Sequence, residues 1–209
     1  MTAEIILTLV LAAVLTGMKT AYGKEWFSDS EQPFYRVWLN RSLYPWSMIW
    51  IAVYLAIWYC FGRSAQTVRV ADLIVSYLIL AIVDVKRKIV PDPILVCFFC
   101  SQMILGTVTM IPSEIWHFFW TGCIFSAAVF VLTAISGGRA GTGDALLLAV
   151  TAVTAGWGYT MQILMVGLFL SFLFGIMLML FRKASIKTEI PFVPFLAAGI
   201  LIHTMLWIL

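Results

Sequence analysis

Apolar runs of about 20 residues, separated by short polar breaks, follow one another along nearly the whole chain, and this is the length that a helix needs to cross a bilayer. The chain is 63% hydrophobic and 11% charged, whereas about a quarter of the residues of a soluble domain are charged. A membrane barrel would alternate apolar and polar residues along each strand, and the sequence has no such alternation. It therefore predicts an all-α, polytopic membrane protein.

We expect about eight transmembrane helices within one membrane-embedded domain, residues 1–209. The sixth is the shortest, because about 15 residues at 1.5 Å per residue cover only about 22 Å. One long connection, at about 20–42, is aromatic and basic, as is typical of a cytoplasmic or interfacial loop. The expected helices are 3–20, 43–62, 68–85, 92–111, 115–136, 143–157, 159–182 and 190–209.

The basic residues are distributed unevenly between these helices. Only Arg63 and Arg69, of 13 Lys and Arg, fall outside the loops that follow the first, third, fifth and seventh helices. Cytoplasmic loops accumulate Lys and Arg, so we expect these four loops in the cytoplasm and both termini outside. Those loops contain Lys19, Lys24, Arg36, Arg41, Lys86, Arg87, Lys88, Arg139, Arg182, Lys183 and Lys187.

Two aspartates are expected at the cytoplasmic ends of helices. Asp84 ends the third helix and Asp144 opens the sixth, and ionisable groups at membrane depth are functional candidates. If the two helices pack together, one ionised carboxylate can take a proton from water while the other, protonated, donates to a peptide carbonyl or leaving amine. Gly141 and Gly143, just before Asp144, would let an extended substrate approach the backbone closely.

Three ordered motifs resemble those of the type IV prepilin peptidase family. They are GTGD at 141–144, which has the GxGD pattern, Asp84 followed by Pro91 and Asp92, and PFVPFLAAG at 191–199. The resemblance implies an intramembrane aspartyl protease of the GxGD type in the cytoplasmic membrane. It would remove the basic leader from prepilin or pseudopilin helices at the cytoplasmic face, without a metal.

The resemblance also implies roles for individual residues. Asp84 and Asp144 would be the catalytic pair. Asp92 and Glu189 are candidate partners for leader lysines, although capping or solvation of helix ends explains them equally well. The remaining substrate-binding candidates, taken from the glycine loop and the C-terminal motif, are Gly141, Gly143, Pro191 and Pro194.

The chain departs from the family pattern at several places. Leu146 stands where many relatives have Lys, and Val193 replaces a glycine of the C-terminal motif. The loop at 20–42 has no cysteine, whereas relatives that also methylate the new N-terminus have a cysteine pair there. We therefore do not expect a methyltransferase, and S-adenosylmethionine would be a cofactor only if that activity exists.

Other readings of the polar residues stay open. A proton- or cation-coupled transporter, an assembly scaffold or an inactive peptidase homologue would also place carboxylates in membrane helices.

Asp72 lies about 18 Å along the same helix from Asp84, too far to join the pair, and we expect it to make an interhelical hydrogen bond. Cys97 and Cys100 form a CxxC without further ligands, which favours packing over metal binding. Lipids are expected partners and nucleic acid is not.

Overall fold

The computed structural model describes residues 2–27, 43–61, 64–136, 141–181 and 190–208, and these residues form eight helices and no strand. The all-α prediction is confirmed, and each expected helix has a counterpart. The helices are α1 (Thr2–Phe27), α3 (Leu43–Phe61), α4 (Ala65–Arg87), α5 (Asp92–Thr109), α6 (Pro112–Ile135), α7 (Thr142–Ala155), α8 (Trp157–Leu180) and α9 (Val193–Ile208).

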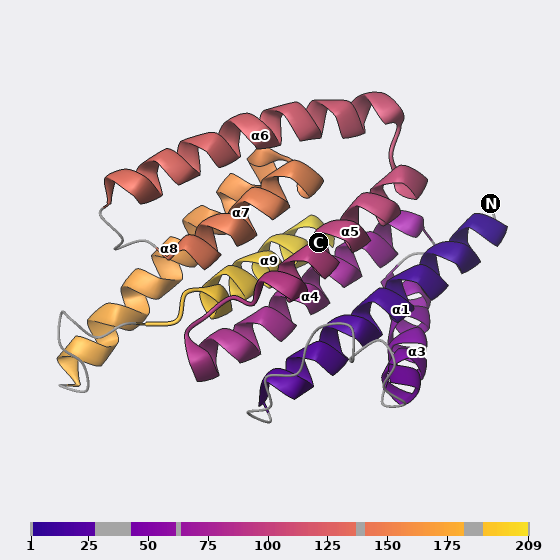
Figure 1. Ribbon diagram of the computed structural model, residues 1–209, viewed down its shortest axis with the longest axis horizontal. Coiled ribbons are helices and arrows are strands. Elements are labelled where there is room, and N and C mark those ends of the chain that lie inside the picture. Colours follow the sequence, from indigo (N-terminus) through magenta and orange to yellow (C-terminus); the bar gives the residue numbers. More distant parts are fainter. Residues whose placement is uncertain (1, 28–42, 62–63, 137–140, 182–189, 209) are drawn as a thin grey trace.

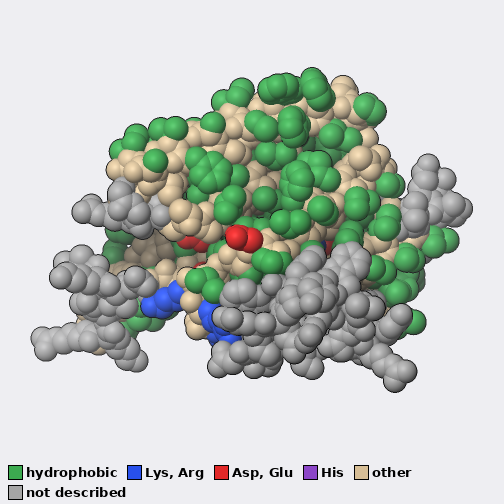
Figure 2. All heavy atoms as spheres, viewed as in Figure 1, with side chains coloured by type: hydrophobic (Ala, Val, Ile, Leu, Met, Phe, Trp, Pro, Cys, Tyr) green, Lys and Arg blue, Asp and Glu red, His purple; other side chains and the backbone are tan. Residues whose placement is uncertain are grey.

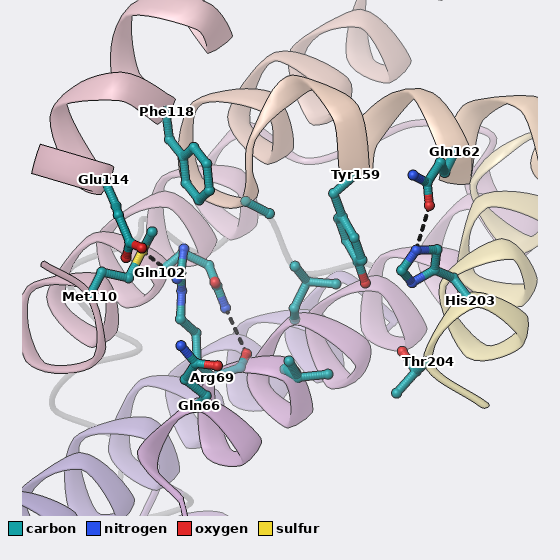
Figure 3. A pocket seen from close by; sticks show the side chains of 13 residues that line it. Gln66, Arg69, Gln102, Met110, Glu114, Phe118, Tyr159, Gln162, His203 and Thr204 are labelled. Atoms are coloured by element: carbon teal, nitrogen blue, oxygen red, sulfur yellow. Dashed lines mark hydrogen bonds between the residues drawn. The ribbon is translucent and has the colours of Figure 1, made fainter. Parts of the chain in front are cut away.

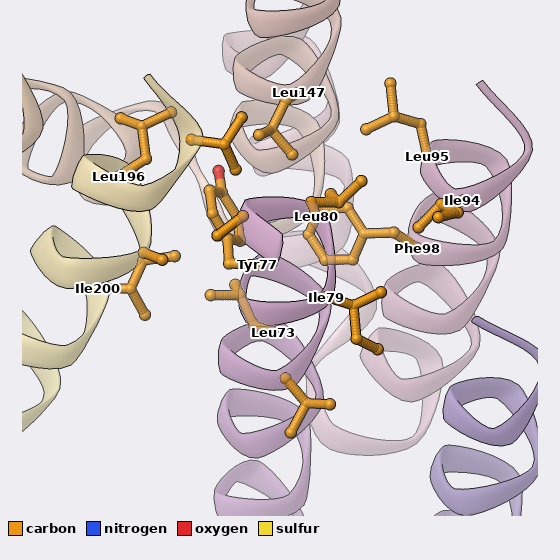
Figure 4. Packing of buried hydrophobic residues seen from close by; sticks show 14 of the residues in the cluster. Leu73, Tyr77, Ile79, Leu80, Ile94, Leu95, Phe98, Leu147, Leu196 and Ile200 are labelled. Carbon is orange, nitrogen blue, oxygen red and sulfur yellow. The ribbon is translucent and has the colours of Figure 1, made fainter. Parts of the chain in front are cut away.

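Helix α4 lies at the centre of the bundle. It packs against α1 and α3 on one side and against α5 and α9 on the others, while α6 lies along the outside of α7 (Figure 1). The main core forms where α4, α5, α7 and α9 meet. Figure 4 shows Tyr77 and Leu80 of α4 between Phe98 of α5, Leu147 of α7 and Leu196 of α9.

Helices α5, α6 and α8 are each long and apolar enough to cross a membrane. Most side chains of α6 and α8 face outward, since only five of the residues in these two helices are buried: Gly122, Thr133, Thr160, Ile163 and Gly167. Hydrophobic side chains accordingly cover the upper surface in Figure 2, while the visible charged groups gather below it. Such an apolar exterior is what lipid contact requires. The number of spans, eight, stays a prediction.

The sequence predicts the turn between α7 and α8 well but the end of α1 poorly. The turn between α7 and α8 is made by Gly156 with φ of 92°, a conformation that glycine adopts without strain. Helix α1, by contrast, was expected to end near residue 20 and continues to Phe27. Residues 28–42 of the expected long loop lie outside the described part of the chain.

The structure also corrects the placement of Lys19. This residue was expected in a cytoplasmic loop, but it is fully buried inside the bundle and forms an ion pair with Asp72 of α4, with Nζ 2.9 Å from Oδ1. The ammonium also donates to Ser76 and Ser101. The interhelical hydrogen bond expected for Asp72 is confirmed, because its carboxylate accepts from residues of three other helices, α1, α3 and α5: Thr16, Lys19, Tyr54, Ser101 and Gln102.

Candidate active site

Asp84 lies near the C-terminal end of α4, on the side that faces α9. Its side chain is only 5% exposed, and Oδ2 accepts a hydrogen bond of 3.0 Å from the backbone N–H of Val193 at the start of α9. The helix ends directly afterwards at Lys88, whose φ is 52° and whose N–H donates to the Asp84 carbonyl. One oxygen of the carboxylate is thus held by the backbone of a distant segment.

Asp144 lies in the first turn of α7. Gly141 is the N-cap of this helix, and its carbonyl accepts the N–H of Ala145 at 3.1 Å. The Asp144 side chain is half-buried. Unpaired N–H groups give a helix N-terminus partial positive charge, which favours a carboxylate in the first turn.

A hydrogen bond between α4 and α7 fixes the relative depth of the two aspartates. The hydroxyls of Tyr77 and Thr151 lie 2.6 Å apart in the core. Tyr77 precedes Asp84 by seven residues and Thr151 follows Asp144 by seven, which is about 10 Å, or two turns, along each helix. Since the helices run in opposite directions (Figure 1), this contact places the two carboxylates at the same end of the bundle.

Both carboxylates line one cavity of about 250 Å³. The loop with the GxGD pattern forms one wall, and the segment joining α4 to α5 forms another. The cavity brings together the ends of α4 and α7 that carry the two aspartates, which is what a shared acid–base role would require; that role itself stays a prediction. The lining residues are Asp84, Lys88, Ile89, Val90, Asp92, Gly141, Thr142, Gly143, Asp144 and Leu146.

The two motif glycines have different surroundings. A β-carbon added at Gly141 would lie 3.1 Å from Oδ2 of Asp144, so a side chain there would crowd the carboxylate. At Gly143 an added β-carbon would lie 2.9 Å from Cβ of Val90. The second glycine therefore permits close packing of the α7 N-terminus on the segment after α4, and the first keeps space open beside Asp144.

The C-terminal motif holds Asp84 through its backbone. Val193 is fully buried and supplies the amide, while Pro191 and Pro194 on either side of it are not among the residues that line the cavity. Any residue other than proline provides such an N–H, so the valine in place of the family glycine leaves this hydrogen bond intact. The roles of the two prolines stay predictions.

The two remaining substrate-binding candidates, and the histidines and cysteines of the chain that could in principle take part in chemistry, are placed as follows. Asp92 is exposed and lines the cavity, whereas Glu189 lies outside the described residues. His117 is exposed on α6, and His203 of α9 lines a different cavity. Cys97 is buried and Cys100 exposed on α5, and both thiols are free. In the described part of the chain no group of three His, Cys, Asp or Glu could hold a metal.

Two contributions to the site were not predicted. Lys88, Ile89, Val90 and Thr142 also line the cavity, and their only signal in the sequence is that they lie within or next to the motifs. The N–H of Val193 was missed because a backbone donor leaves no mark on residue type. The one indication in the sequence was that Val193 belongs to the C-terminal motif, which lies more than a hundred residues after Asp84.

The arrangement suits acid–base chemistry on a polar bond such as a peptide bond. Two carboxylates at one cavity can share the work of proton transfer, because one acts as base in its ionised form while the other acts as acid in its protonated form. The cavity lies at the end of the bundle, next to a loop with exposed backbone at Gly141 and Thr142. A chain segment can reach the carboxylates there without crossing the core.

Comparison with known proteins gave one match. No curated protein and no solved structure matches the chain. The sequence profile of the type IV leader peptidase family matches residues 72–180, a range that covers more than half of the chain and contains both Asp84 and Asp144. The chain therefore belongs to the type IV leader peptidase family.

Proposed function

We propose that the protein is an intramembrane aspartic endopeptidase that removes the basic leader from type IV prepilin-like substrates at the cytoplasmic membrane face. The observation that carries this proposal is the shared cavity of Asp84 and Asp144, with the GxGD loop as its wall. Family membership supports a peptidase in general. The dyad supports an aspartic mechanism, and the motifs favour a prepilin-like substrate.

The proposed reaction begins with a water molecule between the two carboxylates. The ionised carboxylate takes a proton from the water while the water oxygen attacks the scissile carbonyl carbon. The protonated carboxylate donates its proton to the carbonyl oxygen. The resulting diol collapses when the carboxylate that is now ionised takes a proton from one diol hydroxyl, the C–N bond breaks, and the leaving nitrogen takes the proton held by the other carboxylate. One water is consumed, no cofactor takes part, and both carboxylates return to their original protonation states.

Substrate binding is assigned to the surroundings of the dyad. An extended segment would lie against the backbone at Gly141, where no side chain intervenes. Asp92, exposed at the same cavity, is the candidate partner for a leader lysine, and Glu189 remains a second candidate. Leu146 also lines the cavity and is 37% exposed, so its apolar side chain would contact the substrate where many relatives have a lysine.

The cytoplasmic orientation rests on the charges near this end of the bundle. Lys86, Arg87 and Lys88 follow Asp84 directly at the end of α4. Basic residues next to membrane helices are retained in the cytoplasm. The dyad would then meet the leader on the side of the membrane where prepilins are made.

The test is cleavage of a leader-bearing prepilin by purified protein, followed by mass spectrometry of the product. Asp84→Asn and Asp144→Asn should each lower the rate by at least about a thousandfold, and the double variant should lose little more, because the two groups act as a unit. Asn keeps an oxygen that can accept the Val193 N–H, so folding should persist. His117→Ala, on an exposed position of α6, is the matched control and should retain most activity.

The same assay separates the proposal from its rivals. A bell-shaped dependence of the wild-type rate on pH is expected for a coupled pair of carboxylates. If wild-type protein binds prepilin but releases no leader, the chain is an inactive homologue. If either single variant cleaves near the wild-type rate, the dyad assignment is wrong, and a transport or scaffold role becomes the better account.

A further inference from the structure

A second cavity, of about 480 Å³, lies at the end of the bundle opposite the dyad. It is built from the first turns of α4, α6 and α8 and from the last turns of α5, α7 and α9. Figure 3 shows Arg69, Glu114, Gln102, Tyr159, Gln162 and His203 around it. Neither the proposed peptidase reaction nor the family motifs use any of these side chains.

Arg69 brings a positive charge to this cavity. Its guanidinium donates to the Thr154 carbonyl at the end of α7 and to the sulfur of Met110. A guanidinium has five N–H donors, so several remain for a ligand. Among the described residues, no carboxylate oxygen lies within 4.0 Å of Arg69. Glu114 interacts with this half-buried cation through space but forms no direct ion pair with it, so an anionic group next to the guanidinium would offset the cost of its burial.

The same cavity also offers acceptors. Glu114 of α6 lines it and accepts a long hydrogen bond, of 3.4 Å, from the N–H of Ile111. Gln102 is 1% exposed and donates through Nε2 to Asp72 and to the Arg69 carbonyl, but its Oε1 is buried without a partner. Only one other buried side-chain atom in the described residues lacks a partner, the indole nitrogen of Trp58. An acceptor in this state indicates a missing donor.

Exposed tryptophans indicate that this end of the bundle lies at a membrane surface. Trp116 and Trp120 in the first turns of α6 and Trp157 at the start of α8 are each more than half exposed. Tryptophan gathers at the level of the lipid headgroups. Helix α5 has 18 residues, about 27 Å of rise, so a cavity at its end lies at headgroup depth when the dyad lies at the other surface.

We propose that this cavity binds the headgroup of an aminophospholipid, with the phosphate at Arg69 and the ammonium at Glu114. The headgroup has a negative phosphate and a positive ammonium, and these charges complement the positive Arg69 and the negative Glu114. Its N–H groups also provide a donor for Gln102. Leu73 and Phe118 form apolar walls of the cavity and suit the glycerol and the start of the acyl chains. The site lies in the leaflet opposite the dyad.

The test uses the full chain in mild detergent with three lipids that share the same acyl chains. Phosphatidylethanolamine has both charges and N–H donors, phosphatidylcholine lacks the N–H donors, and phosphatidylglycerol lacks the cation. Native mass spectrometry should show one retained phosphatidylethanolamine, at an affinity at least about fivefold above the other two, and this lipid should raise the melting midpoint most. Equal retention of the three lipids would overturn the proposal.

Variants and a soluble headgroup complete the design. Glu114→Gln should abolish the preference for phosphatidylethanolamine over phosphatidylcholine while retaining binding at the phosphatidylcholine level. His117→Ala, in the same part of α6 but outside the cavity, should leave the preference unchanged. An unchanged preference in Glu114→Gln would contradict the site. If free glycerophosphoethanolamine shifted the melting midpoint as much as phosphatidylethanolamine does, the ligand would be a soluble molecule, and the lipid proposal would be wrong. Prepilin cleavage is measured in parallel, so failure of either proposal is seen separately.

Discussion

At the scale of single residues, Gly143 controls how closely the loop before α7 approaches the segment after α4. A β-carbon at Gly143 would lie 2.9 Å from Cβ and 3.3 Å from Cγ2 of Val90, well inside the separation at which apolar carbons attract. We expect Gly143→Ala to lower cleavage by at least about tenfold and also to lower the melting midpoint, since overpacking costs about 1–3 kcal/mol. Cleavage and differential scanning fluorimetry measure the two effects.

A second substitution tests whether the cause is steric. Val90→Gly removes the opposing carbons, so the nearest remaining atom of residue 90 would be its backbone nitrogen, at 3.6 Å. The double variant should therefore regain part of the activity and stability that Gly143→Ala loses. Gly141→Ala is the contrasting case: among the described residues its β-carbon would meet only the Asp144 carboxylate, so the rate should fall with little change in melting. A double variant no better than Gly143→Ala would contradict the packing explanation.

At the scale of helices, the buried pair of Lys19 and Asp72 joins α1 to the helix that carries Asp84. The Lys19 ammonium donates to both oxygens of Asp72, and the surrounding hydroxyl and amide groups donate further hydrogen bonds to the same carboxylate. Removing one partner of a buried pair leaves an uncompensated charge and costs about 3–5 kcal/mol. We expect Lys19→Met and Asp72→Leu each to lower the melting midpoint strongly.

The double variant Lys19→Met and Asp72→Leu should recover most of this loss, because two apolar side chains of similar size can replace a buried pair at little cost. Prepilin cleavage per folded molecule should stay near the wild-type value in all three variants, since the network lies about 18 Å along α4 from Asp84. If the double variant melts no higher than the single variants, the pair contributes more than charge compensation. Thermal melting in detergent distinguishes the two outcomes.

At the scale of the whole molecule, hydropathy was enough to locate the helices but not the charges inside them. Lys19 was assigned to a loop because the positive-inside pattern treats each basic residue as flanking a span. Its partner Asp72 lies 53 residues further along the chain, and nothing in the sequence links the two. Similarly, motifs in the sequence indicate Asp84 and Asp144 as candidates. Residue type does not indicate the Val193 amide that donates to Asp84, because this hydrogen bond depends on the packing of α9 against α4.

The arrangement of the two cavities makes a prediction for membrane topology. Helix α5 begins beside the dyad and ends beside the second cavity, and α9 runs from Val193 at Asp84 to His203 and Thr204 at the second cavity. A reporter after Arg87 should therefore lie on the opposite side of the membrane from one after Ile111, and a reporter at the C-terminus should lie on the side of Ile111. The basic end of α4 assigns the Arg87 side to the cytoplasm.

Fusions that carry both a phosphatase, active only outside, and a fluorescent protein, fluorescent only in the cytoplasm, give a positive signal for either location. We expect fluorescence after Arg87 and phosphatase activity after Ile111 and at the C-terminus. Phosphatase activity at Arg87 would reverse the orientation and exclude the dyad from the cytoplasmic face. In the structure α9 starts at the dyad end, near Arg87, and ends at the opposite end of the bundle. Fluorescence at both Arg87 and the C-terminus would therefore show that α9 does not cross the membrane.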